Sequence, residues 1–186
     1  MGKDKEKPKY AVINSNIIFS SIIKEEGFTR AALLFLKDIS RLKFLVPKTV
    51  VTEVKLNIGQ ISRKSGLSHN TILAALENML EGTEKVNEFD LGSEIREGLK
   101  YVNDEDDTPF VAIALKFRPS FIMTYNKKDY KIKSLEKLDV FVVTPKELLS
   151  MMDIEDLEFE SRQKKKGNLM HYFGKFMMKF RKQYQQ

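Results

Sequence analysis

The fold is decided by the stretch Tyr10-Ala11-Val12-Ile13-Asn14-Ser15-Asn16, where an apolar run ends abruptly in three polar residues. A run without polar alternation predicts a strand that is buried on both faces, as in a parallel sheet. The same change of character follows two further apolar runs, Phe44–Val46 and Phe121–Thr124. The carboxyl ends of parallel strands lie along one edge of a sheet, so we expect the polar residues after each run to converge there.

Strands and helices alternate along the first 152 residues. We predict strands over 10–14, 44–46, 86–89, 121–124 and 140–144, and helices over 17–24, 29–42, 48–61, 68–80, 93–102, 108–117 and 145–152. Thr29, Ser68 and Thr108 are good N-cap residues, and Pro109 suits a first helical turn. The helix over 108–117 is apolar nearly all round, a composition that only an interior helix tolerates. The alternation predicts a doubly wound α/β fold with a central parallel sheet.

The composition excludes several kinds of active site. The chain has 186 residues, no Cys and only two His, so a Cys/His zinc site, a Cys nucleophile and a disulfide framework are impossible. A Ser-His-Asp triad would need His69 or His171, and neither follows a predicted strand. If the protein is an enzyme, chemistry that uses carboxylates and a hard divalent cation is what remains.

The character of the chain changes after residue 152. We predict a disordered lead-in over 1–9, a globular domain over 10–152, and an acidic-then-basic linker with an amphipathic C-terminal helix over 153–186. The net charge of +6 belongs to the tail, because the residues from 162 onward contain eight Lys/Arg and no Asp or Glu. The residues before 162 therefore carry −2, the difference between +6 and +8. No apolar run approaches the roughly 20 residues that span a bilayer, and we expect a cytoplasmic protein.

The tail also carries an apolar stripe at helical spacing: Leu169, Phe173, Phe176, Met177, Phe180 and Tyr184. Burying such a stripe against another surface is favourable, so we expect it to pack on something. The alternatives are the chain's own domain, a second copy in a homodimer, an RNA or ribosomal surface, and an anionic membrane.

Four short blocks follow one another along the chain: Val12-Ile13-Asn14-Ser15-Asn16-Ile17-Ile18, Val46-Pro47 followed by Glu53-Val54, Asp107-Thr108-Pro109 with the apolar helix after it, and Thr124-Tyr125-Asn126-Lys127-Lys128-Asp129-Tyr130. In this order they resemble the PIN-domain nucleases, a family that includes the toxins of many prokaryotic toxin-antitoxin pairs. The resemblance covers about residues 10–150. It implies a three-layer sandwich around the parallel sheet, a metal-dependent endoribonuclease activity, and an antitoxin protein as a partner.

The resemblance also implies roles for individual residues. The catalytic positions are Asn14, Glu53, Asp107 and Asp129, and the last three would hold Mg²⁺ or Mn²⁺. Metal ions of this kind neutralise a phosphodiester and lower the pKa of a bound water. Ser15, Asn16 and Thr124 would orient the ligands or bind phosphate indirectly, through hydrogen bonds to the groups around the metal, and Asn126 would hold a water or complete the metal's surroundings.

Asn14 departs from the family pattern, which has an Asp at this position. A neutral amide should weaken metal binding and cleavage. Three interpretations follow: a degenerate site used for binding, a site rescued by another ligand such as Asp104, and an inactivating substitution. Two functions therefore remain: a metal-dependent endoribonuclease, and a catalytically inactive PIN-like module that binds RNA or a protein. The bland alternative is that acids such as Asp107 only stabilise a helix N-terminus.

Overall fold

The computed structural model describes residues 10–39 and 42–151. This part contains the strands β1 (Tyr10–Ile13), β2 (Lys43–Pro47), β3 (Glu84–Val86), β4 (Ser120–Met123) and β5 (Val140–Val143). Its α-helices are α1 (Ser15–Ile23), α2 (Phe28–Ile39), α3 (Thr49–Leu56), α4 (Ile58–Ser65), α5 (His69–Leu80), α6 (Gly92–Gly98), α7 (Thr108–Lys116), α8 (Ile132–Glu136) and α9 (Pro145–Met151). Short 3-10 helices are η1 (Glu88–Asp90), η2 (Leu99–Tyr101), η3 (Glu105–Asp107) and η4 (Lys127–Asp129).

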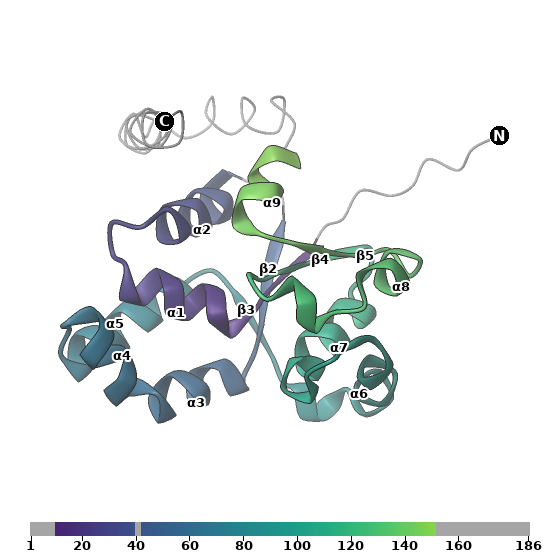
Figure 1. Ribbon diagram of the computed structural model, residues 1–186, viewed down its shortest axis with the longest axis horizontal. Coiled ribbons are helices and arrows are strands. Elements are labelled where there is room, and N and C mark those ends of the chain that lie inside the picture. The colour runs from purple at the N-terminus through teal and green to yellow at the C-terminus, as the bar shows by residue number, and fades with distance from the viewer. Residues whose placement is uncertain (1–9, 40–41, 152–186) are drawn as a thin grey trace.

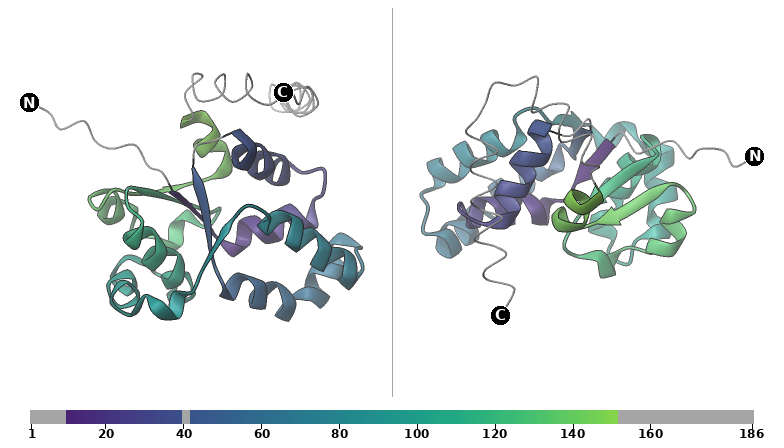
Figure 2. Two further views of the ribbon diagram at one scale, coloured as in Figure 1. Left: turned by 180° about the vertical axis from the view of Figure 1, so that it is seen from behind. Right: turned by 90° about the horizontal axis from the view of Figure 1, so that it is seen from above.

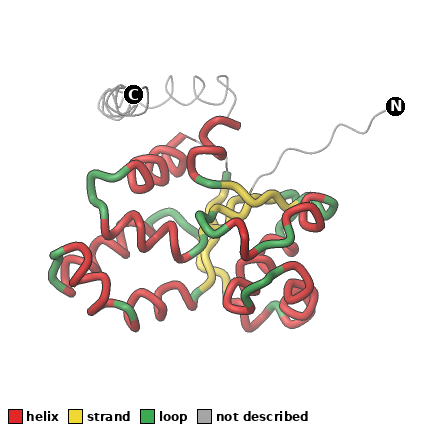
Figure 3. The backbone as a smooth tube through the Cα atoms, viewed as in Figure 1, coloured by secondary structure: helices red, strands yellow, loops and turns green. Residues whose placement is uncertain are grey.

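The five strands form one parallel sheet in the order β3-β2-β1-β4-β5, with β1 at its centre. In Figure 1 the helices α1 to α5 lie on one side of the sheet and α6 to α8 on the other, and the views from behind and above agree (Figure 2). In Figure 3 the strands, drawn in yellow, run between the two groups of helices. The predicted three-layer α/β fold with a central parallel sheet is therefore confirmed.

The core follows from the apolar runs that the sequence shows. Ala11, Val12 and Ile13 of β1 are completely buried, because the sheet is covered on both faces. Helix α7 packs against β1, β2 and β4, and its residues from Phe110 to Leu115 are all buried. The prediction of an interior helix here is confirmed. Because α7 begins at the carboxyl edge of the sheet and leads into β4, it places Asp107 beside the residues that follow β1.

The helix predicted over 48–61 is two helices, α3 and α4, which meet at Asn57. The backbone N–H and the side-chain amide of Asn57 both donate to the carbonyl of Glu53, at 3.0 and 2.9 Å. The carbonyl of Asn57 then accepts from the N–H groups at the start of α4. Asn competes for backbone hydrogen bonds in this way, so the apolar stripe continues through a bend that its spacing does not reveal.

Several smaller predictions are wrong at the ends of elements. Thr108 is the first residue of α7 and Thr29 is the second residue of α2, so neither is the N-cap of its helix. The strand expected at 86–89 occupies 84–86 and is followed by η1, and the helix expected to reach 102 becomes η2 after Gly98. At Gly98, a Cβ would lie 3.3 Å from the carbonyl oxygen of Thr108, so the close approach of α6 to α7 favours glycine. Helix α8 was not predicted at all.

Other boundaries agree with the expectation. Ser68 caps α5, accepting from the N–H of Thr71 at 3.2 Å, and Gly82 follows the end of that helix with φ 71°. The predicted lead-in over 1–9 and the predicted linker and helix over 153–186 lie outside the described residues. Within the described ranges, no helix has both the length and the apolar composition needed to cross a membrane.

Candidate active site

An acidic cleft of about 580 Å³ opens at the carboxyl edge of the sheet. It is lined by Asn14, Ser15, Asn16, Phe19, Thr49, Glu53, Asp104, Glu105, Asp106, Asp107, Pro109, Phe110, Asn126 and Asp129. Six of these residues are carboxylic acids, and no Lys or Arg is among them. The predicted convergence of Asn14, Glu53, Asp107 and Asp129 is thus present in the structure. Their roles as ligands or catalysts remain predictions.

Asp107 occupies the N-cap position of α7 but makes no capping hydrogen bond with its side chain. Its Oδ1 instead accepts from the amide nitrogen of Asn14 at 2.6 Å and from the hydroxyl of Tyr130 at 2.9 Å. A negative charge here favours the start of α7 with or without a hydrogen bond to it. Capping alone, however, does not require the two bonds that Asp107 makes to other segments of the chain.

The orientation of the Asn14 amide follows from its neighbours. Its oxygen accepts from the backbone N–H of Asn16 at 3.0 Å, which is the N-cap bond of α1. A backbone N–H can only donate, so the oxygen must face Asn16 and the amide nitrogen must face Asp107 and Tyr130. The amide nitrogen donates to Tyr130 at 2.8 Å as well as to Asp107. The side of the Asn14 amide that faces Asp107 therefore carries N–H donors. The amide oxygen, which could bind a metal ion, faces Asn16 instead.

Tyr130 is the functional residue that sequence reasoning missed. It is 4% exposed, and its hydroxyl closes a triangle of hydrogen bonds with Asn14 and Asp107. Burial, and then the adjacent carboxylate of Asp107, hold the pKa of the Tyr130 hydroxyl far above its usual range. The hydroxyl therefore stays protonated and donates to Asp107. The signal available in sequence was a tyrosine directly after Asp129 in the last matched block.

Glu53 is half-buried on α3, on the side of the helix that faces the cleft. Burial raises the pKa of its carboxyl, opposed by a hydrogen bond from Ser15, and the carboxylates of Asp106 and Asp107 raise it further. The pKa of Asp107 is likewise raised, chiefly by burial, although the bonds from Tyr130 and Asn14 act in the opposite direction. The site therefore holds carboxylates in surroundings that disfavour their negative charge.

The position of Glu53 depends on a second acid, Glu88 of η1, which sequence reasoning did not single out. Glu88 is buried, and its two carboxylate oxygens accept from the backbone N–H groups of Lys48 and Thr49, each at 3.0 Å. These N–H groups belong to the start of α3, where a negative charge is favourable. Glu88, although distant in the sequence, thus caps α3, the helix that carries Glu53.

Asn16 and Thr124 join α1 to the end of β4. The amide nitrogen of Asn16 donates to the Thr124 hydroxyl at 2.8 Å, and its oxygen accepts from the N–H of Tyr125 at 3.2 Å. The Thr124 hydroxyl also accepts from the N–H of Asn126 at 3.0 Å. Thr124 is completely buried and does not line the cleft. Thr124 therefore acts from outside the cleft, by holding the loop that carries Asn126, and its role in orienting ligands stays a prediction.

The donor chemistry of the cleft suits a hard divalent cation, but the ligands are not preassembled around one point. Glu53, Asp104, Asp107 and Asp129 all supply carboxylate oxygens to the cleft. However, no three His, Cys, Asp or Glu side chains among residues 10–39 and 42–151 are grouped closely enough to hold a metal ion. One oxygen of Asp104 also accepts from the N–H of Asp106 at 3.1 Å. A cation would therefore have to draw these side chains together.

The fold and the cleft define a class of protein, a parallel α/β domain with a carboxylate-lined cleft at the carboxyl edge of its sheet. The chain matches the PIN domain family over residues 12–128, more than half of its length, and it therefore belongs to that family. Proteins of this family are generally nucleases.

A solved structure with a similar fold is a chain of the VapBC2 complex from Rickettsia felis. That complex was crystallised with a DNA fragment from the promoter of VapBC2. The two chains share 14% identity and a TM-score of 0.51 over 73% of this chain and 98% of that one. No curated protein matches the chain.

Proposed function

We propose that this protein is a metal-dependent endoribonuclease whose activity is held low by Asn14. The proposal is carried by one observation, the side chain of Asp107. It lies at the start of α7 without capping that helix, in a cleft that gathers six carboxylic acids from three segments: α3, residues 104–107 and η4. A fold does not require this concentration of like charge, and proteins accept it where a cation or a reaction needs it.

Glu53, Asp107 and Asp129 are the residues that we propose to hold Mg²⁺ or Mn²⁺, with Asp104 as a further ligand. When bound, such a cation would neutralise the phosphodiester and activate a water molecule. The chain's own contribution is to position these acids. Asn14 and Tyr130 hold Asp107, while Glu88 caps the start of the helix that carries Glu53.

Asn14 explains why we expect low activity. Its amide nitrogen lies 2.6 Å from Asp107 and places positive hydrogen atoms where a cation would otherwise approach that oxygen. The amide oxygen cannot substitute as a ligand while it caps α1. The same observation favours the second candidate function, a catalytically inactive module that binds RNA or a protein, because the hydrogen-bonded triangle is complete without a cation.

The two candidates are separated by cleavage of a labelled single-stranded RNA in Mn²⁺. We expect slow cleavage by the protein with Asn14, faster cleavage by Asn14→Asp, and a loss of at least about tenfold in Glu53→Gln. Glu77→Gln is the matched control, because Glu77 is exposed on α5 and lies outside the cleft. If Glu53→Gln cleaves as fast as the protein with Glu53, the cleavage does not use the proposed metal ligand and the nuclease proposal fails.

We also propose an antitoxin protein as a partner. The support is the fold shared with a chain of the VapBC2 complex, together with the family assignment. A small neighbouring reading frame whose product copurifies with this chain and blocks its cleavage of RNA would establish the pair. Copurification without inhibition would contradict a toxin-antitoxin relationship.

A further inference from the structure

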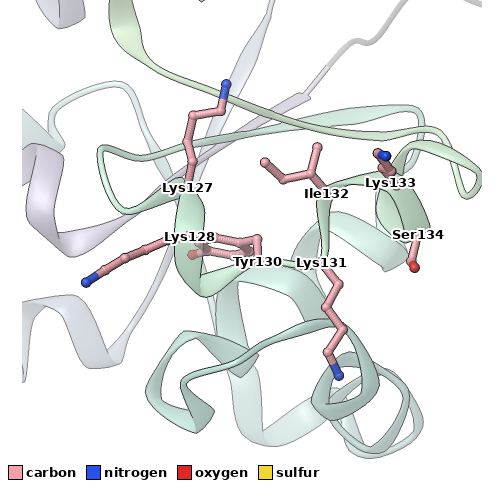
Figure 4. A pocket seen from close by; sticks show the side chains of 7 residues that line it. All are labelled: Lys127, Lys128, Tyr130, Lys131, Ile132, Lys133 and Ser134. Atoms are coloured by element: carbon pink, nitrogen blue, oxygen red, sulfur yellow. The ribbon is translucent and has the colours of Figure 1, made fainter.

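We propose that a lysine-lined groove beside the cleft binds the phosphate backbone of single-stranded RNA and directs it to the acids. This inference rests on the proposed function, since it concerns the substrate of that cleft. The groove has a volume of about 440 Å³ and is lined by Lys127, Lys128, Tyr130, Lys131, Ile132, Lys133 and Ser134. Figure 4 shows the four lysine side chains spreading outward in different directions, with Tyr130 and Ile132 among them.

Three of the four lysines are available to a ligand. Lys127 pairs with Glu147 of α9, its ammonium lying 3.0 Å from each carboxylate oxygen. Lys128, Lys131 and Lys133 are exposed, and no ion pair within residues 10–39 and 42–151 involves them. Lys131 also donates to the carbonyl of Lys100 at 2.9 Å, which fixes its stem without neutralising its charge. The groove therefore presents three positive charges to solvent.

The groove and the cleft are joined by the segment that follows β4. Asn126 and Asp129 line the cleft, while Lys127 and Lys128 between them line the groove. Tyr130 lines the groove, and its hydroxyl reaches Asn14 and Asp107 in the cleft. A polymer lying over this short segment would meet the lysines and the carboxylates at neighbouring positions along its length.

Charge complementarity indicates a polyanion. Six carboxylic acids in the cleft repel phosphate, so a nucleic acid must be attracted from beside it. Lysines are point charges on flexible stems, and they contact phosphate without reading bases. An acidic peptide could contact the same lysines, but the neighbouring carboxylates would only repel it. For a phosphodiester chain those carboxylates are the proposed metal ligands of the reaction. We therefore expect binding that depends on salt and not on base sequence.

The test is a fluorescence-anisotropy titration of the full chain with a labelled oligouridylate of about 20 nucleotides, in EDTA, at several salt concentrations between about 50 and 200 mM. The groove variant is Lys128→Gln, Lys131→Gln, Lys133→Gln. The matched control is Lys43→Gln, Lys64→Gln, Lys116→Gln, whose residues are exposed and line neither the groove nor the cleft. Both variants keep the basic tail, so its contribution cancels in the comparison.

The slope of log K against log salt should fall in magnitude by about 2 in the groove variant, since each lysine on single-stranded nucleic acid contributes about 0.7. The control should keep the slope of the natural sequence. Equal slopes in both variants overturn the proposal. A glutamate-rich peptide that loses binding to the groove variant, while RNA binding is unchanged, also overturns it and indicates a protein ligand.

Failure of the groove and failure of the nuclease are distinguishable, because binding is measured in EDTA and cleavage in Mn²⁺. If Glu53→Gln cleaves normally while the salt slope of the groove variant falls by about 2, the nuclease proposal fails and the groove remains. If Glu53→Gln loses cleavage while both lysine variants bind equally, the reverse holds.

Discussion

Replacing Asn14 by Asp should make the protein unstable without metal and strongly metal-stabilised, because it places a second carboxylate against Asp107. The present donor and acceptor are 2.6 Å apart. Two negative charges about 4 Å apart at an effective dielectric constant of 20 repel by about 4 kcal/mol. The alternative is to protonate one carboxyl, which at pH 7 also costs about 4 kcal/mol for an ordinary Asp.

The loss of unfolding free energy in Asn14→Asp should therefore reach about 4 kcal/mol at pH 7, or roughly 10 °C in Tm for a chain of this size. Burial already raises the pKa of Asp107, so the true cost lies below that limit. At pH 5 protonation costs only about 1.5 kcal/mol, and the protonated carboxyl can donate to Asp107. The instability should thus grow as the pH rises from 5 to 7.

The assay is thermal unfolding in EDTA and in Mn²⁺, with Asn78→Asp on the exposed face of α5 as the matched control. Metal at 100 times the Kd of Asn14→Asp should return about 2.7 kcal/mol to that variant, and the same concentration should return less to the protein with Asn14, which supplies no oxygen ligand. If Asn14→Asp in EDTA at pH 7 unfolds at the temperature of the natural sequence, the contact between Asn14 and Asp107 is not as described.

Three further variants test the supports of the site by denaturant unfolding. Glu88→Gln should lose about 1.5 to 3 kcal/mol, because it removes a charge that accepts two N–H groups at the start of α3, and an unchanged stability would contradict this cap. Thr108→Val should gain about 1 kcal/mol, since the buried Thr108 hydroxyl has no hydrogen-bond partner among the described residues, whereas a loss would reveal one. Glu53→Gln in EDTA should be more stable than the natural sequence at pH 7, with the difference vanishing as the pH falls below the usual pKa of a Glu. The sign follows because a folded-state pKa raised by burial makes the folded form bind more protons, so stability falls as the pH rises through that range.

The wider consequence concerns how a PIN domain tolerates the loss of an acid at the end of its first strand. Asn14 keeps the geometry of that position, since it caps α1 and holds Asp107, while it removes one negative charge from a crowded cleft. Active sites that concentrate like charges commonly trade stability against activity, and the proposed effect of Asn14 is of this kind. Whether the remaining acids suffice for cleavage is decided by the Glu53→Gln comparison.

The sequence by itself determined the parallel α/β fold, because apolar runs without alternation and the helices between them are local patterns. It also determined which polar residues follow the strands, and the common edge of a parallel sheet brought Asn14, Glu53, Asp107 and Asp129 together. It did not predict the break at Asn57, since a side-chain bond to a nearby carbonyl overrides a continuous apolar stripe.

Only the tertiary structure decided what those polar residues do. Asn14 meets Asp107 across 93 residues of chain and Tyr130 across 116, and no local pattern records which end of an amide faces which partner. The cap of α3 by Glu88 crosses about 40 residues in the same way. These contacts depend on the relative placement of separate elements to within a hydrogen-bond length, and packing of the whole domain sets that placement.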